Sequence, residues 1–314
     1  SQSEALVLLE LTGEEKLNDC FVFDLTCVAP KFTINFDKLL GQEVSIIFRY
    51  GDKDAQMRYI HGIVGEVRQG PTNLDDIDRK AIPKPKTFTV TQVVNGEKVT
   101  KEVTVPAPET TIYLKVYPAL WTTKFTQNCK IFQEKSTLDI IKAVLGEHKL
   151  IKKIKYDNTN CGNEQREYCV QYNESDYDFV TRLMAEDGLF FYHDHTREGH
   201  TLVIADAPAT HQELKDPKKI QTQQFRPKTP LPNQIQAIEL GQQVIVQGVA
   251  GTDYNFLTPS TDLFTSQGEA KPTTRVYYYP GSFLDTGKGT SRTKHGLEYH
   301  TWQKTLVQGR STIF

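Results

Sequence analysis

Three histidines in the second half of the chain have a spacing that could bind a metal ion. His193 and His195 alternate within a run of strand-forming residues, and His200 follows after a short polar turn. In a hairpin, the first two imidazoles would share one face and His200 could lie across from them, close enough to converge on zinc or copper. The pattern places no acidic general base, and histidine spacing without a closed ligand set is a weak signal. We therefore predict no bound metal or other cofactor, and keep a metal-dependent enzyme using these histidines as an alternative.

A cluster of acidic residues, Glu174, Asp176 and Asp178, could indicate carboxylate catalysis. The cluster lies at the expected start of a helix, where the dipole and the unpaired backbone N–H groups favour negative charge. We interpret it as a helix cap. The sequence contains no G-x-S-x-G nucleophile elbow and no glycine loop in the strand–helix setting that binds phosphate. These observations predict a protein that is not an enzyme and has no catalytic residues.

Adjacent aromatic residues at 190–192 and 277–279 could form a platform for a ligand. In strands, however, neighbouring aromatics more often serve the core on one face and an interface on the other. We therefore favour an assembling protein, and keep a ligand-binding β-module as a further alternative.

Composition excludes several classes of protein. The 314 residues carry a net charge of -2, without the clustered basic surface expected for nucleic-acid binding. No segment approaches the ~18 consecutive apolar residues of a membrane span, and the polar start does not resemble a signal peptide. The cysteines are odd in number and lack CxxC spacing, which favours free thiols; they are Cys20, Cys27, Cys129, Cys161 and Cys169.

The first third of the chain has the alternating pattern of antiparallel strands. Residues 21–28 place Phe21, Phe23, Leu25 and Cys27 on one face. Further along, Asn95-Gly96 separates two β-branched runs at 87–105, which is the strongest short-range signal for a hairpin.

Two helices are predicted in the middle. Ser136 and Ser175 are each followed three residues later by an aspartate, as in a capping box, and Gly188 provides a stop for the second helix. A hairpin is expected directly afterwards, with strands at 189–195 and 200–205. We interpret residues 281–295, which are rich in Gly, Ser, Thr and Lys, as a mobile segment and 297–306 as a terminal helix.

The central block resembles the VgrG family of type VI secretion spike proteins and their phage tail-hub relatives. The family motif covers Phe132, Gln133, Arg166, Tyr168, Cys169, Gln171, Tyr172, Glu174, Ser175, Asp176, Asp178, Phe179, Arg182, Leu183 and Gly188. The likeness extends over about residues 5–310 and is most specific at 166–192. Residues 80–110 look like an insertion, Lys130 stands where the family usually has arginine, and the sequence stops before the family's OB-fold neck and β-helix needle.

The resemblance implies a mainly β fold with a small helical part: two similar antiparallel β-barrels of the phage tail-hub type joined by a helical connector. Residues 1–125 would form the first barrel with its inserted hairpin, 126–188 the connector, and 189–314 the second barrel region and a C-terminal extension. In this family such motif residues are structural.

The resemblance also implies a structural role in a contractile injection machine. Three chains would form a ring whose six barrels match the hexameric Hcp tube and carry the membrane-puncturing spike. Implied partners are baseplate components and, through the missing C-terminal part, a PAAR-type tip protein and effectors. We expect no nucleic acid and no stable membrane association. The protein would be cytoplasmic during assembly and then leave the cell with the machine, without a signal peptide. The alternative within this class is a tail-hub protein of a contractile phage.

Overall fold

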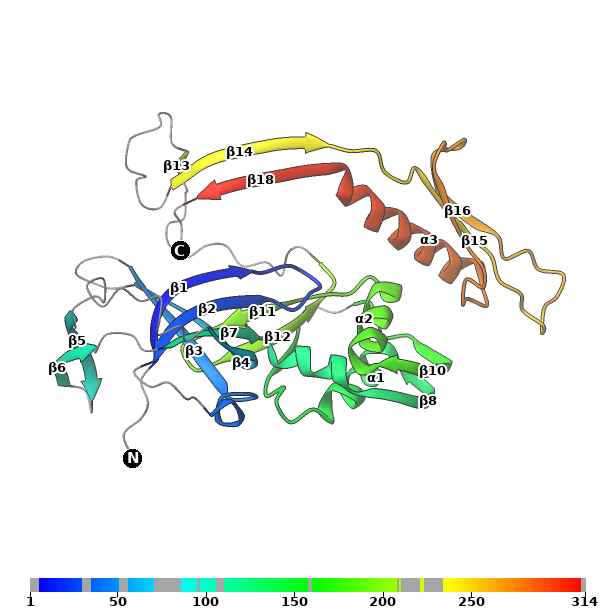
Figure 1. The fold of residues 1–314 in the computed structure, drawn as a ribbon. Coiled ribbons are helices and arrows are strands. Elements are labelled where there is room, and N and C mark those ends of the chain that lie inside the picture. Colours follow the sequence, from blue (N-terminus) through cyan, green and yellow to red (C-terminus); the bar gives the residue numbers. More distant parts are fainter. Residues whose placement is uncertain are drawn as a thin grey trace.

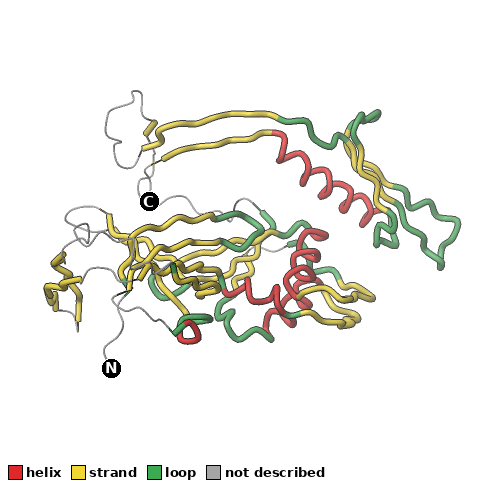
Figure 2. Tube along the Cα trace, in the orientation of Figure 1, coloured by secondary structure: helices red, strands yellow, loops and turns green. Residues whose placement is uncertain are grey.

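The structure is a computed structural model. It describes residues 6–29, 35–50, 56–70, 86–94, 97–105, 110–157, 160–207, 209, 221–222 and 234–311. Over these residues the fold is mainly β with a few helices, as Figures 1 and 2 show, and this part of the expected fold class is confirmed. No helix among them combines the length and apolar character needed to cross a membrane.

Five antiparallel strands form the N-terminal sheet, in the order β1-β2-β7-β4-β3. They are β1 (Val7–Glu14), β2 (Val22–Ala29), β3 (Glu43–Tyr50), β4 (Gln56–Gln69) and β7 (Thr110–Tyr117), with the 3-10 helix η1 (Phe36–Lys38) before β3. The predicted alternation is confirmed, because Phe21, Phe23 and Cys27 are all buried. Phe21 and Phe23 pack with Ile46, Ile60 and Val116 into the core of this sheet.

The predicted hairpin is also confirmed. Strands β5 (Lys86–Val94) and β6 (Glu97–Val105) pair antiparallel along their whole length. The hairpin lies between β4 and β7 in the sequence, yet these two strands pair directly with each other. It is therefore inserted without interrupting the sheet, and it lies at the edge of the molecule in Figure 1. Its turn residues, Asn95 and Gly96, lie outside the described residues.

A small α/β region follows the sheet. Its elements are η2 (Ala119–Phe125), β8 (Gln127–Ser136), α1 (Thr137–Gly146), β9 (Ile154–Asp157), β10 (Gln165–Ser175) and α2 (Asp176–Asp187). Ser136 and Ser175 cap the two helices, since each side chain accepts a hydrogen bond from the backbone N–H three residues on. Gly188 ends α2 in the left-handed conformation, with a φ of 74°, which glycine adopts without strain. Both helix predictions are confirmed.

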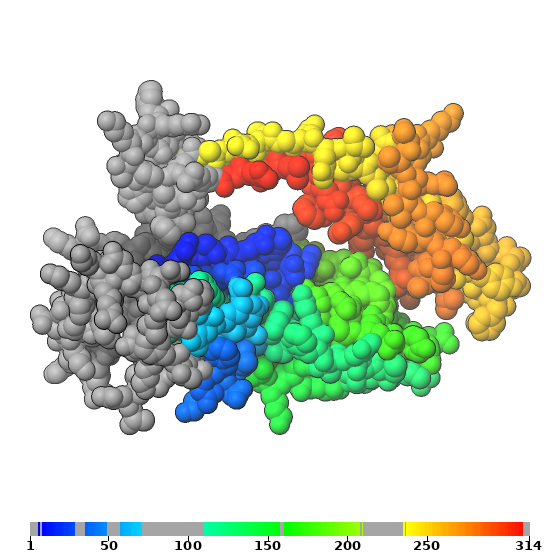
Figure 3. Space-filling model, in the orientation of Figure 1, coloured from blue at the N-terminus to red at the C-terminus, as the bar shows by residue number. Residues whose placement is uncertain are grey.

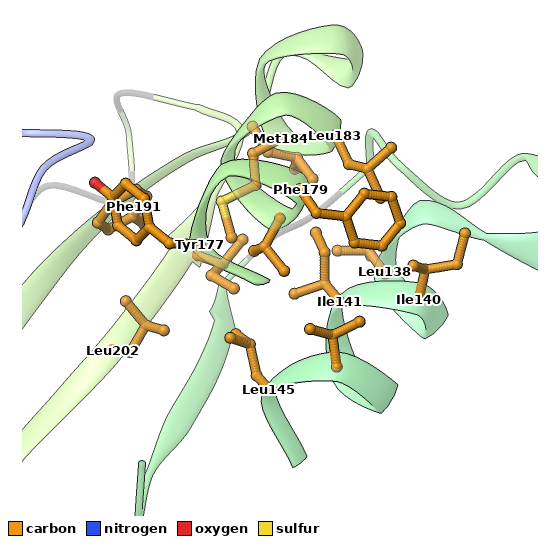
Figure 4. Packing of buried hydrophobic residues seen from close by; sticks show 14 of the residues in the cluster. Leu138, Ile140, Ile141, Leu145, Tyr177, Phe179, Leu183, Met184, Phe191 and Leu202 are labelled. Carbon is orange, nitrogen blue, oxygen red and sulfur yellow. The ribbon is translucent and has the colours of Figure 1, made fainter. Parts of the chain in front are cut away.

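The hairpin after α2 joins the helices to the N-terminal sheet. Strands β11 (Phe190–His195) and β12 (His200–Ala205) pair antiparallel, and β9 adds to β12 in parallel. The largest core of the molecule lies between α1, α2 and this hairpin, where Leu145, Leu183 and Leu202 are buried (Figure 4). Truncating such a side chain to alanine typically costs about 2–5 kcal/mol. On the other side, β11 and β12 contact β4.

The C-terminal part contains a long ribbon and a small sheet. Its elements are β13 (Gln221–Thr222), β14 (Gln234–Gln242), β15 (Gly248–Gly251), β16 (Thr265–Gly268), β17 (Arg275–Tyr278), α3 (Thr286–Thr301), η4 (Trp302–Lys304) and β18 (Thr305–Ser311). Strands β14 and β18 pair antiparallel, and β15 is flanked by β16 and β17. Figure 3 shows an opening between this ribbon and the N-terminal sheet. Along the ribbon Leu240 is 77% exposed.

The prediction for the C-terminal helix was wrong in its position. The helix α3 begins at Thr286, within the segment expected to be mobile, and residues 305–311 form β18 instead of continuing it. The Asp285 side chain caps the helix by accepting from the Lys288 N–H at 2.9 Å. Gly289 allows the Phe283 ring to lie against the helix backbone, because an added Cβ would be 2.6 Å from that ring. Tertiary packing thus overrides the low helix propensity of a Gly- and Thr-rich segment.

Candidate functional site

The residues of the family motif come together at the two-stranded β8–β10 pair and the helix α2. Strand pairing places Phe132 opposite Cys169 and Gln133 opposite Tyr168, although the two blocks are more than 30 residues apart in sequence. The motif therefore describes one continuous region of the fold.

The β8–β10 pair presents two different faces. Cys169 and Gln171 point inward and are buried, and Phe132 lies over Phe179 of α2 with ring centroids 5.7 Å apart. On the outward face, Tyr168 is exposed and Tyr172 is 79% exposed, beside the exposed Ile131. The inward residues support the core of the helices, whereas the outward ones provide an apolar surface that is exposed to solvent.

The three clustered carboxylates turn out to have three different environments. Asp178 belongs to the helix cap, as expected: Ser175 Oγ donates to its Oδ2 at 2.6 Å and accepts from its backbone N–H at 3.0 Å. Glu174 instead pairs with Arg182, and Asp176 is fully buried. The expected position at the helix start is therefore confirmed for Asp176 and Asp178, which both lie in the first turn of α2, and Asp178 is the one that bonds to the capping Ser175.

Asp176 is an internal anchor. Its carboxylate accepts hydrogen bonds from Gln171 Nε2 at 2.7 Å and Asn128 Nδ2 at 3.0 Å, and it lies 2.8 Å from His148 Nε2. Burial acts to raise the pKa of Asp176, but the hydrogen bonds from Gln171, Asn128 and His148 outweigh it and lower the pKa below its ordinary value. A buried carboxylate held by three side chains connects β8, β10 and the loop after α1. It is not poised to transfer a proton at neutral pH.

Arginines and carboxylates form a second network at the far end of α2. Arg166 donates to Glu186 at 2.7 Å, to Asp187 at 3.0 Å and to Thr137 Oγ1 at 2.7 Å. Arg182 binds Glu174 through two parallel hydrogen bonds of 3.2 and 2.7 Å, the geometry that a guanidinium prefers for a carboxylate.

Glu186 lies at the centre of this network. Besides Arg166, it accepts from Arg182 at 3.0 Å and from Arg292 of α3 at 3.4 Å. Burial acts to raise the pKa of Glu186, but the arginines, led by Arg166, lower it below its ordinary value. The contact with Arg292 ties α3 to α2. Sequence reasoning missed Arg292, Asn128 and His148, because these partners lie outside the motif and nothing in their local pattern marks them.

The three histidines come close together, and the predicted arrangement in the hairpin is confirmed. His195 pairs directly with His200 across the strands, and His193 lies on the same face. Their rings surround Phe21, with centroids 5.2–6.4 Å from the Phe21 ring. The described residues contain no group of three or more His, Cys, Asp or Glu side chains arranged to hold a metal ion. The rings pack around an aromatic side chain instead of converging on a common point.

Comparisons with known proteins agree with this description. The model of the phage tail baseplate hub (GPD) family matches residues 14–314. The type VI secretion system spike protein VgrG1b of Pseudomonas aeruginosa is 26% identical over 318 residues, which cover 98% of this chain and 38% of that protein. The spike protein VgrG1a of the same organism is 24% identical over 317 residues, 99% of this chain and 43% of that protein. The chain thus spans about two fifths of the length of these relatives.

Solved structures show the same fold. An Escherichia coli component of the type VI secretion system, described as similar to T4 bacteriophage tail proteins, matches 77% of this chain and 54% of its own, with a TM-score of 0.53 and 16% identity. A tail protein from Neisseria meningitidis matches 95% of this chain and 73% of its own, with a TM-score of 0.57 and 12% identity. The fold, the motif and the family match agree, and the chain belongs to the phage tail baseplate hub (GPD) family.

Proposed function

We propose that this chain is the hub-forming part of a type VI secretion spike protein and that it acts as a structural component, not as an enzyme. The observation that carries the proposal is the match to spike proteins over nearly the whole chain. The motif residues Cys169, Phe179 and Leu183 pack into the core around the two helices. The ionisable groups of the motif support a mechanical role. Asp176 and Glu186 are held in the charged state by several donors each, which favours rigidity over proton transfer.

In the proposed organisation, residues 1–125 form a first β-barrel that carries the inserted hairpin, and 126–188 form the helical connector. Residues 189–314 contribute the second barrel region and the C-terminal extension, with β11–β12 packed against β4 of the first part. The five-stranded antiparallel sheet supports the first assignment and the α1–α2 core supports the second. The long β14–β18 ribbon supports the third, because its exposed apolar side chains need covering in an assembly.

Three such chains would form a ring with six barrels. A threefold ring of paired barrels can dock onto a hexameric tube of the Hcp type, which resolves the mismatch between a trimeric spike and a sixfold tube. Baseplate components would surround the ring. A PAAR-type tip and effectors would attach through parts of the spike outside this chain. Exposed aromatic residues, such as Tyr168 and Tyr172, are the side chains that protein interfaces favour.

The direct test of this function uses the bacterium that carries the gene. Deleting the gene should abolish release of the tube protein into the medium, and the intact gene supplied in trans should restore it. A deletion strain that still releases the tube protein, with no second spike gene expressed, would contradict the proposal.

A hub of a contractile phage or phage-like particle is the second candidate, favoured by the fold likeness to the Neisseria tail protein. The two candidates differ in the tube that they bind. Purified protein should bind preformed rings of the secretion tube protein, visible as capped rings by electron microscopy. Capping of a phage tail tube alone would select the second candidate.

The metal-dependent enzyme is a function of a different class, and the packing of His193, His195 and His200 around Phe21 does not favour it. Elemental analysis of the purified protein separates the two classes. We expect zinc and copper well below one atom per chain. A stoichiometric metal that is lost in a His200→Ala variant would instead favour a metal-dependent enzyme.

A further inference from the structure

A joint between two parts of the molecule is built from histidines. His61 of β4, His193 and His195 of β11, and His200 of β12 gather at the place where the β11–β12 hairpin meets the N-terminal sheet. Phe21, only 2% exposed, fills the centre. The rings of His193 and His200 are 6.0 Å apart and those of His195 and His200 are 5.9 Å apart, centroid to centroid. A positive charge on one ring would thus face neighbouring imidazoles at short range.

Two hydrogen bonds of the joint require neutral rings, at His195 and at His200. The backbone N–H of His61 donates to Nδ1 of His195 at 3.1 Å, so this nitrogen carries no proton. The single proton of His195 is then on Nε2, which is buried without a hydrogen-bond partner, as is Nε2 of His193. In the same way the Ala119 N–H points at Nε2 of His200, 3.5 Å away. Protonating Nδ1 of His195 would place two donors against each other and break a bond between β4 and β11.

The charged groups around the joint oppose protonation of the rings or are already paired. The positive charge of Arg58 on β4 lowers the pKa of His195, and that of Lys152 lowers the pKa of His200. Glu43 of β3 favours a charged His200, but its carboxylate is bound to Lys152 at 2.7 Å. His61 is held by Ser45 Oγ at 2.8 Å and the Thr196 carbonyl at 2.7 Å. Among the described residues, no carboxylate forms a hydrogen bond or ion pair with the other three rings.

We propose that His193, His195 and His200 form an acid-sensitive joint, which holds β11–β12 against β4 when the rings are neutral and opens when they are protonated. Burial and the neighbouring imidazoles lower the pKa of His193 to about 3. Burial, followed by the imidazoles of His200 and His61 and then by Arg58, lowers the pKa of His195 to about 3. Burial also lowers the pKa of His200.

The opening equilibrium of the joint depends on pH because the open and closed states bind different numbers of protons. In the open state these rings regain the ordinary pKa of 6.5, so the open state binds more protons at any pH between about 3 and 6.5. The closed joint is therefore fully stable above pH 6.5 and weakens as the pH falls below it. Each of His193 and His195 favours opening about 10-fold more at pH 5.5 than at pH 7.5, or about 100-fold together. The buried carboxylates titrate at lower pH and do not contribute in this window.

Hydrogen–deuterium exchange of the intact protein tests the proposal. After correction for the intrinsic pH dependence of exchange, the opening equilibrium of residues 56–69 and 190–205 should rise about 100-fold from pH 7.5 to 5.5, while α1 changes little. The double variant His193→Phe and His195→Gln removes both titrating rings and leaves an acceptor for the His61 N–H. It should lose most of the pH dependence, whereas the control His300→Gln on α3 should behave as the wild type. An unchanged slope in the double variant would overturn the proposal.

A second measurement serves if the double variant does not fold. In the wild-type protein, the Cε1–H NMR signals of His193 and His195 should keep the chemical shift of neutral rings in the closed state at pH 5.5. A ring of this pair that titrates near pH 6.5 in the folded protein, without opening of the joint, would overturn the proposal as well.

Discussion

At the scale of single residues, Glu186 shows how one carboxylate can hold three segments together. Its carboxylate forms ion pairs with Arg166 of β10, Arg182 of its own helix and Arg292 of α3. Multidentate pairs of this kind are stiff, because a guanidinium and a carboxylate match in geometry as well as in charge. Such fixed contacts stiffen the place where β10, α2 and α3 meet, which suits the mechanical role proposed above.

Replacing Glu186 with glutamine tests this residue. The change keeps the shape but removes the carboxylate that three guanidinium groups share, while Arg166 keeps Asp187 and Arg182 keeps Glu174. We expect a loss of about 2 kcal/mol in the free energy of unfolding, less than for a fully buried pair because the site is partly exposed. Urea denaturation provides the measurement. The control Glu298→Gln disrupts only the exposed pair with Lys294 and should cost little. Equal effects of the two changes would show that the network stabilises the fold no more than an exposed ion pair does.

The buried Asp176 carboxylate should make the free energy of unfolding depend on pH. Its pKa is lowered from the ordinary value of 3.8, so its stabilising contribution is complete above that value and is lost as the pH falls below it. Asp176→Asn should therefore cost about 1–3 kcal/mol at pH 7. The amide oxygen still accepts from Gln171 and Asn128, which both donate to Oδ1, but the charge is lost and an amide NH2 replaces the oxygen that faces His148 Nε2. The difference from the wild type should shrink near pH 3.

The measurement is the urea midpoint at pH 7, 5 and 3. Glu167→Gln, at an exposed position of the preceding strand β10, is the control and should show no such trend. A cost of Asp176→Asn that is the same at pH 7 and pH 3 would mean that its carboxylate is not held in the charged state.

At the scale of elements, the sequence predicted the segments whose signals are local. The capping serines, the stop at Gly188 and the alternation around Phe21 depend on neighbours within a few residues. The helix α3 could not be located in this way. Its stability depends on Phe283 packing over Gly289 and on Arg292 reaching Glu186, which are contacts that only the folded chain creates. For the same reason the motif identified the network around α2 but not its partners elsewhere.

Gly289→Ala distinguishes packing from propensity in α3. Propensity alone would make alanine more favourable by up to about 1 kcal/mol. An added Cβ would, however, lie 2.6 Å from the buried Phe283 ring, so we expect a net loss of stability in the C-terminal part. Exchange protection of residues 286–301 is the readout. Gly146→Ala, at the open end of α1, meets no atom within 4 Å and should not destabilise. A more stable Gly289→Ala variant would refute the packing argument.

The inserted hairpin permits a prediction about assembly. Strands β5 and β6 pair with each other at the edge of the molecule, while β4 and β7 pair without them (Figure 1). We propose that the hairpin contacts a neighbouring chain or a baseplate component. Replacing residues 84–108 with a short Gly/Ser linker should weaken assembly and leave the urea midpoint of the monomer unchanged. Assembly with unchanged affinity would mean that the hairpin has no such partner.

At the scale of the whole molecule, the distribution of apolar surface is the feature that calls for partners. The core between α1, α2 and β11–β12 is well covered. In contrast, Leu240 and Val307 on the β14–β18 ribbon and Tyr172 on β10 are largely exposed. Contiguous apolar surface on a protein usually marks an interface. The resemblance to spike proteins could be read from the motif, but the number of chains and the identity of the tube lie in surfaces that a single chain does not define.

The mass of the assembly in solution tests the proposed trimeric hub most directly. Light scattering over a concentration series should be performed on this chain, of 35.7 kDa, and on the natural polypeptide that contains it. We expect a mass that reaches three chains, in the natural polypeptide at the least, and in this chain as well if the proposed barrels alone carry the ring interface. A natural polypeptide that stays monomeric or dimeric across the series would contradict the trimeric hub.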